Sequence, residues 1–208
     1  DECITLNVLV GPWSFSMPAG SPAPVLPSGL SFNVFTQDFY DFIKDDPRFE
    51  ATVFDLEALS AAGLASYIAG YQNTGYFLNK FLPRRSDVRT GGGALELNYR
   101  QNTPIIRLAD PYLMEAEALG GTGARAQALL DAVRARVGLA SVPVSLEAIK
   151  AERRLELAGE GHRFFDLVRW GDAAAKLASR GFVANKHEVF PIPEREVQGT
   201  LLVQNPGY

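Results

Sequence analysis

The sequence predicts a mostly α-helical protein, a tetratricopeptide-like stack of helical hairpins joined to an irregular, loop-rich region with a few short strands. Apolar side chains in the second half recur at the i, i+3, i+4 spacing of amphipathic helices. Glycine-rich breaks separate these helices. In the first half, prolines and aromatic residues interrupt any regular period. A hydrophobic content of 47% is enough to build real cores.

We therefore expect two regions. Residues 1–102 are predicted to be rich in loops and aromatic residues, with short strands and helices, and to carry the ligand-binding face. Residues 103–208 are predicted to hold the helical hairpins and an extended C-terminal tail. In such a stack, each helix pair buries its apolar stripe against the next pair.

The first region is expected to contain short elements. Alternating apolar residues over 3–10 predict a strand. Five prolines within 11–29 predict an irregular loop without a regular ladder. Thr36 is a good N-cap for a short helix that ends before the turn at 45–49. The remaining elements expected here are a strand at 51–54, a loop at 58–89 and a flexible connector at 89–94.

The second region is expected to begin with a helix from Pro104, after the cap Thr103. Pro111 should kink this helix or restart it near Asp110, because proline removes a backbone donor. Its predicted buried face consists of Ile105, Leu108, Ala109, Tyr112, Leu113, Ala116 and Leu119. Three further helices are expected at 124–137 before the C-capping Gly138, from the cap Ser145 to Leu157, and at 163–179.

Charge and motif content exclude several classes of function. A net charge of −4 provides no basic field for nucleic acid. The single Cys3 excludes an internal disulfide framework and a cysteine-based zinc site. No P-loop, GxSxG, HExxH or strand-linked GxGxxG occurs, and no stretch approaches the roughly 20 apolar residues of a membrane span. The sequence predicts no nucleic-acid partner, no cofactor and no metal site.

A charged block near the third and fourth helices admits two interpretations. Glu156, Glu160, His162 and Asp166 could form an acid/base pair or a metal site. The neighbouring arginines can neutralise each acid, however, and a third metal ligand is not evident, so we favour a structural seam between the two helices. The residues of this structural signature are Glu152, Arg153, Arg154, Glu156, Glu160, Arg163, Asp166, Arg169 and Trp170.

Several motifs together resemble the C-terminal portion of the SusD/RagB family of outer-membrane nutrient- and glycan-binding lipoproteins. These motifs are IIRLADPYLMEAEAL (105–119), ALLDAVRARVGL (128–139), LEAIKAERRLELAGEGHRFFDLVRWG (146–171), FPIPEREV (190–197) and QNPGY (204–208). Pro111 departs from the family pattern, which has an ordinary helix former there. The N-terminal repeats, signal peptide and lipid-bearing cysteine of the family are expected to lie outside this chain.

The resemblance implies a non-catalytic, starch-binding-like subunit for polysaccharide utilisation. Such a subunit binds an oligosaccharide or polysaccharide and delivers it to a SusC-like TonB-dependent transporter in nutrient uptake. The resemblance also implies a surface-exposed lipoprotein of the outer membrane, which contacts the membrane only through its N-terminal lipid anchor. Within the family resemblance, the charged block is part of the fold and not a ligand site.

Candidate ligand-binding residues are aromatic side chains on loops. Sugars present apolar C–H faces and polar edges, so their sites need exposed flat rings beside amide or charged groups. Trp13 lies in a proline-rich segment, and a tyrosine cluster lies near Gln72, Asn73 and Asn79. The candidates are therefore Trp13, Tyr67, Tyr71 and Tyr76.

Two other functions remain open at this point. The same helical stack could present a groove to a peptide or protein, as a cargo-binding protein or an interaction scaffold. A glycoside hydrolase would need two carboxylates about 5 to 10 Å apart, for which Asp45, Asp46 and Asp55 are available. Asp46 precedes Pro47 and is more simply a turn residue.

Overall fold

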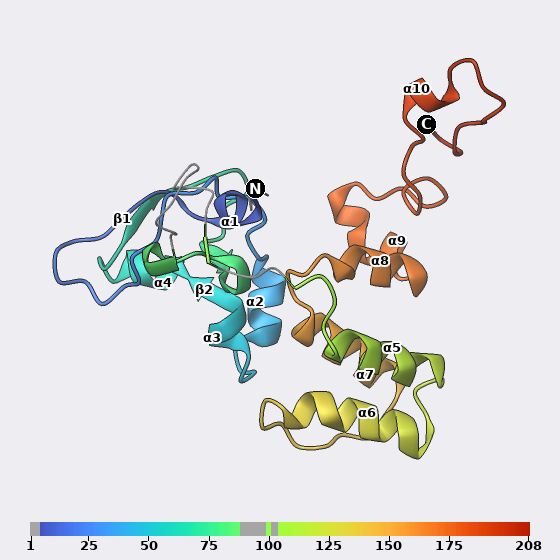
Figure 1. The fold of residues 1–208 in the computed structure, drawn as a ribbon, viewed down its shortest axis with the longest axis horizontal. Helices are drawn as coiled ribbons and strands as arrows, with labels where there is room; N and C mark the ends of the chain where they lie inside the picture. The colour runs from blue at the N-terminus through green and yellow to red at the C-terminus, as the bar shows by residue number, and fades with distance from the viewer. Residues whose placement is uncertain (1–4, 88–98, 101–103) are drawn as a thin grey trace. The chain divides into compact units, whose positions relative to one another are not determined.

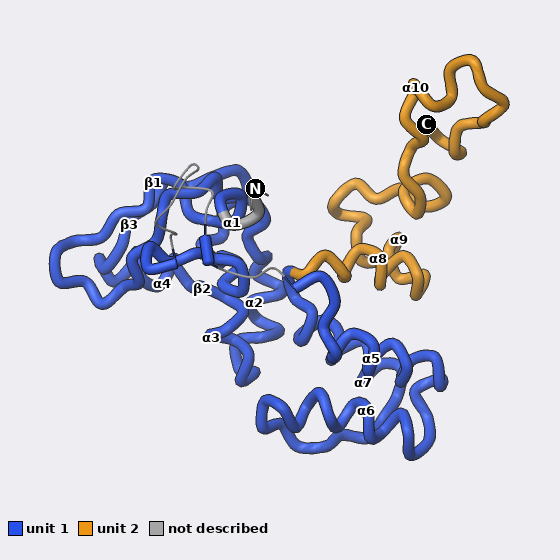
Figure 2. The backbone as a smooth tube through the Cα atoms, viewed as in Figure 1, with its two compact units in different colours: residues 1–159 blue, residues 160–208 orange. Residues whose placement is uncertain are grey.

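The computed structural model describes residues 5–87, 99–100 and 104–208. The chain forms two compact units, residues 1–159 and residues 160–208, which Figure 2 distinguishes by colour. The predicted connector at 89–94 and the predicted cap Thr103 lie outside the described residues. The compositional division at residue 102 stays a prediction.

The first 87 residues contain short helices and strands, as Figure 1 shows. The helices are α1 (Thr5–Val10), α2 (Gln37–Ile43), α3 (Phe49–Thr52) and α4 (Leu56–Ala61), and the 3-10 turns are η1 (Asn79–Phe81) and η2 (Arg85–Asp87). The strands are β1 (Trp13–Ser16), β2 (Val53–Asp55), β3 (Ser66–Ile68) and β4 (Tyr76–Leu78). They pair antiparallel in two sheets, β1 with β3 and β2 with β4.

The strand predicted at 3–10 is wrong over its described part, because Thr5–Val10 is helix α1. A run of six residues is too short for its period to separate helix from strand. Tertiary contacts decide the outcome here. The backbone N–H groups of Leu30 and Phe32 donate to the carbonyls of Val8 and Leu9 at 2.9 and 2.8 Å, which satisfies carbonyls at the end of the helix.

Two predicted loops contain strands instead. The loop at 11–29 includes β1, and the loop at 58–89 includes β3 and β4. Each of these strands pairs with a segment at least twenty residues away in sequence, such as Val53 with Leu78. Local composition does not carry this information. The strand expected at 51–54 lies at 53–55 and follows α3 directly.

Helix α2 begins where the sequence predicted. The Thr36 hydroxyl accepts a hydrogen bond from the Phe39 N–H at 3.3 Å, as a side-chain N-cap does. Phe39 and Ile43 are buried in a cluster with Val53 and Ala158. Helix α2 therefore packs both on strand β2, which contains Val53, and on the residue Ala158 near the end of the first unit.

Helices α5 (Ala109–Ala118), α6 (Gly123–Ala135) and α7 (Leu146–Glu156) share one apolar core, and Figure 1 shows them side by side. The buried residues of this core are Leu113, Ala116, Ala126, Leu129, Leu130, Val133 and Ile149. The Ser145 hydroxyl accepts from the Ala148 N–H at 3.0 Å, and Gly138 has φ +76° after α6. Both predicted helix ends are confirmed.

The helix predicted from Pro104 begins instead at Ala109, close to the restart that was expected near Asp110. Helix α5 begins at Ala109, so Pro111 lies in its first turn, where a backbone N–H has no intrahelical acceptor. The expected burial of Leu119, at the C-terminal end of α5, is wrong because this residue is exposed. The expected burial of Ile105 and Leu108 is also wrong, since Ile105 is 90% exposed and Leu108 is exposed as well. The chain before Ala109 is not helical, so helical spacing does not place these two residues on a buried face.

The second unit contains α8 (His162–Arg169), α9 (Ala173–Leu177), the 3-10 turn η4 (Ala178–Arg180) and α10 (Glu194–Val197). The single helix predicted at 163–179 is divided at Gly171, whose φ is +74°. The C-terminal tail closes on itself, because the Gln204 amide donates to the Ile192 carbonyl and accepts from its N–H, both at 2.8 Å. The predicted fold class, mostly α with a few short strands, is confirmed.

Candidate ligand-binding face

Trp13 lies in β1 and is kept at the surface by a bulge. Trp13 pairs with Ile68 and Ser16 with Ser66, so two residues of β1 face one residue of β3. Ser14 has φ +50° in the bulged part, and such a bulge re-aims a side chain. In a regular strand Trp13 would share a face with Phe15. Phe15 packs on the core of the loop-rich segment, whereas Trp13 is 50% exposed.

The segment that follows Ser28 holds β1 in place. The Ser31 hydroxyl accepts from the Trp13 N–H at 2.8 Å, and the Ser28 hydroxyl accepts from the Ser14 N–H at 3.0 Å. The backbone N–H groups of Gly29 and Ser31 donate to the carbonyls of Pro12 and Gly11 at 2.8 and 2.7 Å. Gly29 must be glycine, since a Cβ there would lie 2.4 Å from the Gly11 oxygen.

Tyr71 lies in the turn after β3 and is 87% exposed. Its neighbour Gly70 lies against Ser31, so that a Cβ on Gly70 would be 2.9 Å from the Ser31 Cβ. Phe32, the residue after Ser31, is 52% exposed. The segments around Trp13, Ser31 and Gly70 therefore meet at Ser31. We call these segments, with the exposed side chains of Trp13, Phe32 and Tyr71, the aromatic face.

The backbone of the aromatic face is strained. Among the described residues, five that are not glycine have positive φ, and four of them are Ser14, Ser31, Asn33 and Gln72. A left-handed conformation costs free energy for such residues and clusters at ligand-binding sites. Ser14 follows Trp13, Ser31 and Asn33 flank Phe32, and Gln72 follows Tyr71.

Sequence reasoning overlooked Phe32. Its signal is a large apolar side chain between Ser31 and Asn33, residue types that accept unusual backbone conformations in turns. Exposed flat rings beside the amides of Gln72 and Asn33 suit a ligand with apolar faces and hydroxyl edges. The face can thus stack a sugar and donate or accept hydrogen bonds at its rim.

The other two candidate tyrosines are engaged inside the protein. The Tyr67 hydroxyl accepts from the Asn73 amide at 3.0 Å and donates to Glu57 at 3.4 Å, and its ring meets Phe77 edge-on at 5.7 Å. The pKa of Tyr67 is raised, first by burial and then by Glu57, against the lowering effect of the Asn73 bond.

Tyr76 packs within the protein in a similar way. Its ring stacks on Tyr40 at 4.1 Å, and its hydroxyl donates to the Gln37 side chain at 3.2 Å. The structure therefore leaves Trp13 and Tyr71 exposed on segments that meet at Ser31, whereas Tyr67 and Tyr76 pack against other side chains. That all four contact ligand stays a prediction.

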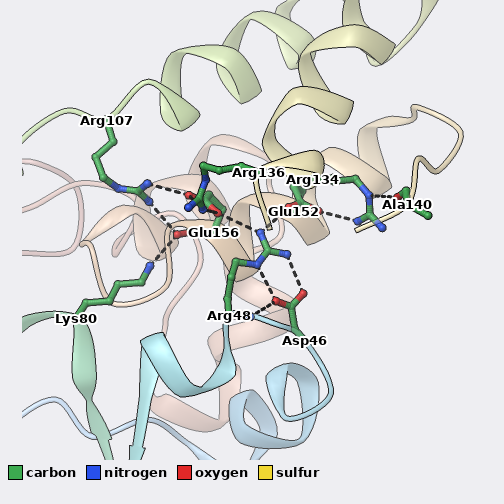
Figure 3. Close-up of polar contacts among 9 residues, drawn as sticks. All are labelled: Asp46, Arg48, Lys80, Arg107, Arg134, Arg136, Ala140, Glu152 and Glu156. Atoms are coloured by element: carbon green, nitrogen blue, oxygen red, sulfur yellow. Dashed lines mark hydrogen bonds and ion pairs between the residues drawn. The ribbon is translucent and has the colours of Figure 1, made fainter. Parts of the chain in front are cut away.

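Two acids of the structural signature, Glu152 and Glu156, are buried in an arginine–carboxylate cluster, which Figure 3 shows. Glu152 accepts from Arg48 at 2.6 Å and from Arg134 at 2.9 Å. Glu156 accepts from Arg48 at 3.2 Å, from Arg107 at 2.8 Å and from Arg136 at 2.6 Å. The cluster consists of Asp46, Arg48, Arg107, Arg134, Arg136, Glu152 and Glu156.

The electrostatics of the cluster favour the ionised carboxylates. Burial alone would raise the pKa of Glu156, but hydrogen bonds and charge from Arg107 and Arg136 outweigh it, so its pKa lies below the ordinary value. The pKa of Asp46 is lowered in the same way, because bonds from the Arg48 side chain and N–H outweigh burial. These groups have the paired, fully bonded form that buried charges require.

The expected position of this seam needs a correction. The four arginines that bind Glu152 and Glu156 all precede α7 in the chain, so these acids tie α7 to α6 and to the loop-rich segment. Side chains 104 and 108 residues apart meet at Arg48, and local spacing could not reveal that.

The remaining signature residues make separate contacts. Arg153 donates to Asp110 at 2.8 Å, and Arg154 pairs with Asp38 while its guanidinium lies 4.2 Å from the Phe42 ring centre. In the second unit, Asp166 pairs with Arg169 at 2.9 Å, and the guanidiniums of Arg163 and Arg169 lie over Trp170. Glu160 lies in the turn before α8.

Two of the acids considered for catalysis, Asp46 and Asp55, have structural partners. Asp46 binds the Arg48 side chain through both carboxylate oxygens, and Asp55 caps α4 by accepting from the Ala58 N–H at 2.9 Å. In the part of the chain that the structure describes, no three His, Cys, Asp or Glu side chains come together as metal ligands. No described helix is both long and apolar enough to span a bilayer.

Similar proteins of known structure are glycan-binding. A protein described as a laminarin-binding SusD-like protein is 65% identical, with a TM-score of 0.94, over 98% of this chain and 44% of that chain. Surface glycan-binding protein A from Bacteroides thetaiotaomicron, in complex with laminarihexaose, is 30% identical, with a TM-score of 0.81, over 97% of this chain and 46% of that chain.

A curated relative is also SusD-like. SusD-like protein P25 of Formosa agariphila is 37% identical over 120 residues, which cover 49% of this chain and 23% of the relative. The chain thus spans less than half the length of these solved relatives and about a quarter of the curated one. Residues 33–187 match the model of the SusD family, and this chain belongs to that family.

Proposed function

We propose that this chain is part of a non-catalytic, cell-surface glycan-binding protein whose aromatic face binds laminarin or its oligosaccharides. The observation that carries the proposal is that the segments bearing the exposed Trp13, Phe32 and Tyr71 meet at Ser31. The chain that bears this face is 65% identical to a laminarin-binding SusD-like protein.

The proposed mechanism is binding without turnover. The ring faces of Trp13 and Tyr71 stack against the C–H faces of the sugar, which removes apolar surface from water. Gln72 and Asn33 bond the hydroxyl edges and select among sugars. The fixed backbone of the face limits the entropy lost when the ligand binds.

We further propose that the protein delivers glycan to a SusC-like TonB-dependent transporter. The support is membership of the SusD family. The same membership favours a surface-exposed lipoprotein of the outer membrane. In this arrangement the helical stack formed by α5, α6 and α7 is available as the scaffold that faces the transporter.

Affinity electrophoresis tests the binding. The protein is run through gels that carry laminarin or one of several other polysaccharides, with a non-binding protein as mobility standard. We expect laminarin to retard the wild type, and Trp13→Ala or Tyr71→Ala to weaken binding roughly tenfold. Phe165→Ala is the matched control, since Phe165 is also an exposed aromatic residue, in the second unit, and should leave retardation unchanged.

Three results would contradict the proposal. Retardation that is equal for wild type and both variants would remove the aromatic face from the binding site. No retardation by any polysaccharide would favour peptide or protein cargo instead. Release of shorter oligosaccharides during incubation with laminarin would show turnover and overturn the non-catalytic assignment.

A further inference from the structure

We propose that Ser31 is a positioning residue, which sets the arrangement of Trp13 and Tyr71 without touching the ligand itself. The effect on affinity rests on the proposed glycan-binding function, whereas the effect on Trp13 does not. Ser31 is 4% exposed, so a ligand on the surface has little access to it.

The link to Trp13 is a hydrogen bond to its backbone. The Ser31 hydroxyl accepts from the Trp13 N–H at 2.8 Å, across 18 residues of sequence. The Ser31 N–H donates to the Gly11 carbonyl at 2.7 Å. These two bonds enclose Pro12 and fix the backbone on both sides of it. Trp13 lies at the start of a bulge, where the neighbouring ladder is interrupted, so this bond replaces part of the lost strand pairing.

The link to Tyr71 is a steric contact. The Gly70 backbone lies so close to Ser31 that a Cβ on Gly70 would be 2.9 Å from the Ser31 Cβ and 3.4 Å from its carbonyl oxygen. Neither atom is the far end of a flexible side chain, so a larger residue 70 would move one segment or the other. One buried side chain therefore contacts the segments that carry Trp13 and Tyr71.

The backbone conformation supports a positioning role. Ser31 has φ +57°, a region that is costly for a serine and free for a glycine. A glycine at this position would avoid that cost, but it would lack the hydroxyl that bonds the Trp13 N–H. A strained residue that persists at a ligand-binding face indicates that its side chain contributes there.

The first experiment needs no ligand. The chain has two tryptophans, so Trp170→Phe leaves Trp13 as the only tryptophan, and excitation at the red edge of the absorption band, where tyrosine does not absorb, selects it. In that background we expect Ser31→Ala to lower the anisotropy of Trp13 and to increase its quenching by acrylamide, since the hydroxyl that restrains its backbone is gone. Ser31→Gly should also lower the anisotropy and increase the quenching, although glycine relieves the backbone strain. A change in both variants therefore reports the loss of the hydroxyl and not the backbone conformation.

Ser145→Ala is the matched control. It removes a serine hydroxyl that also accepts a backbone N–H, at 3.0 Å, at the start of α7. It should lower stability as the loss of a cap does and leave the anisotropy of Trp13 unchanged. If a general loss of stability lowers the anisotropy of Trp13, Ser145→Ala will lower it as the Ser31 variants do. If Ser31 is a positioning residue, the anisotropy falls only in the Ser31 variants.

The second experiment is a double-mutant cycle on laminarin affinity. Ser31→Ala should weaken binding about threefold to tenfold, as expected for the loss of one hydrogen bond. In a Trp13→Ala background the same change should have less than about a twofold effect, because it removes only the hydroxyl that bonds Trp13 and keeps the Cβ that lies against Gly70. Gly70→Ala should also weaken binding, since its Cβ displaces Ser31 or the segment of Tyr71.

The outcomes separate this inference from the proposed function. Unchanged anisotropy and affinity in Ser31→Ala and Ser31→Gly would overturn the positioning role while glycan binding stands. An equal effect of Ser31→Ala with and without Trp13 would overturn it too. If the wild type binds no glycan, the proposed function fails, and the anisotropy of Trp13 still decides the role of Ser31.

Discussion

The arginine–carboxylate cluster and the aromatic face use opposite means to hold side chains in place. In the cluster, every carboxylate oxygen of Asp46, Glu152 and Glu156 has an arginine partner, and the two glutamates are buried. At the aromatic face, the bonds are made by backbone groups and small serines, while the rings of Trp13 and Tyr71 are left exposed.

This difference separates the parts that specify the fold from the parts that are available to a ligand. A buried charge with all its partners ties distant segments together and tolerates little change. An exposed ring on a restrained backbone contributes little to stability, so it is free to meet a partner. The comparison predicts that changes in the cluster lower stability, and that changes at the face lower affinity.

The largest effect is expected when Arg48 is removed. Arg48→Met preserves most of the side-chain volume and leaves Glu152, Glu156 and Asp46 without a shared buried partner. We expect a loss of about 3 to 5 kcal/mol in the free energy of unfolding, because uncompensated buried charge is costly. Urea unfolding followed by circular dichroism measures it.

The matched control for Arg48 is Arg125, whose pair with Glu115 at 2.7 Å lies at the surface. Arg125→Met should leave the urea unfolding midpoint almost unchanged, because water screens an exposed ion pair. If the two substitutions cost the same, the cluster contributes no more than a surface pair, and the contrast drawn above is wrong.

Two tyrosines provide the next test. Tyr76 stacks on Tyr40 and bonds Gln37, so Tyr76→Ala should lower the free energy of unfolding by about 2 to 3 kcal/mol, somewhat less than a fully buried aromatic residue. Tyr71 is exposed, and Tyr71→Ala should change stability by less than about 0.5 kcal/mol. Unfolding midpoints and laminarin affinity are measured on both proteins; a stability loss in Tyr71→Ala as large as in Tyr76→Ala would remove the distinction.

Acid is expected to lower the stability that the cluster provides, over a range of pH. The folded-state pKa values of Glu156 and Asp46 lie below their ordinary values of 4.5 and 3.8. Their stabilisation is therefore fully present above about pH 4.5 and is lost as the pH falls through the folded pKa values. The urea midpoint should fall between pH 5 and pH 3, and it should fall less in Arg48→Met, where Asp46 has lost its main partner. A wild-type midpoint that stays constant over this range would contradict the sign of both shifts.

Helix ends were the part of the fold most readily predicted from sequence. Thr36 and Ser145 each accept the backbone N–H three residues ahead, and Gly138 has the positive φ expected of it. Pro111 marks the first turn of α5. These features depend on one residue and its near neighbours, so local sequence contains the whole cause.

Short elements and the candidate site were predicted less well. The six residues of α1 alternate in hydrophobicity and are nonetheless helical, because residues 30 and 32 bond its carbonyls. Of the four predicted aromatic candidates, Trp13 and Tyr71 are exposed, whereas Tyr67 and Tyr76 pack against other aromatic rings. Composition indicates that an aromatic residue lies in a loop, and it does not indicate which side of the loop faces water.

The sequence by itself determined the helical class, the helix boundaries at capping residues and the likeness to the SusD family, since each depends on local pattern or on motif order. Tertiary structure alone decided that Arg48 binds Glu152, 104 residues away, and that the segments bearing Trp13, Phe32 and Tyr71 meet at Ser31. The physical reason is the range of the forces involved. Caps and periodicity act within a few residues, whereas ion pairs, strand pairing and close packing join segments whose separation in sequence carries no signal of their contact.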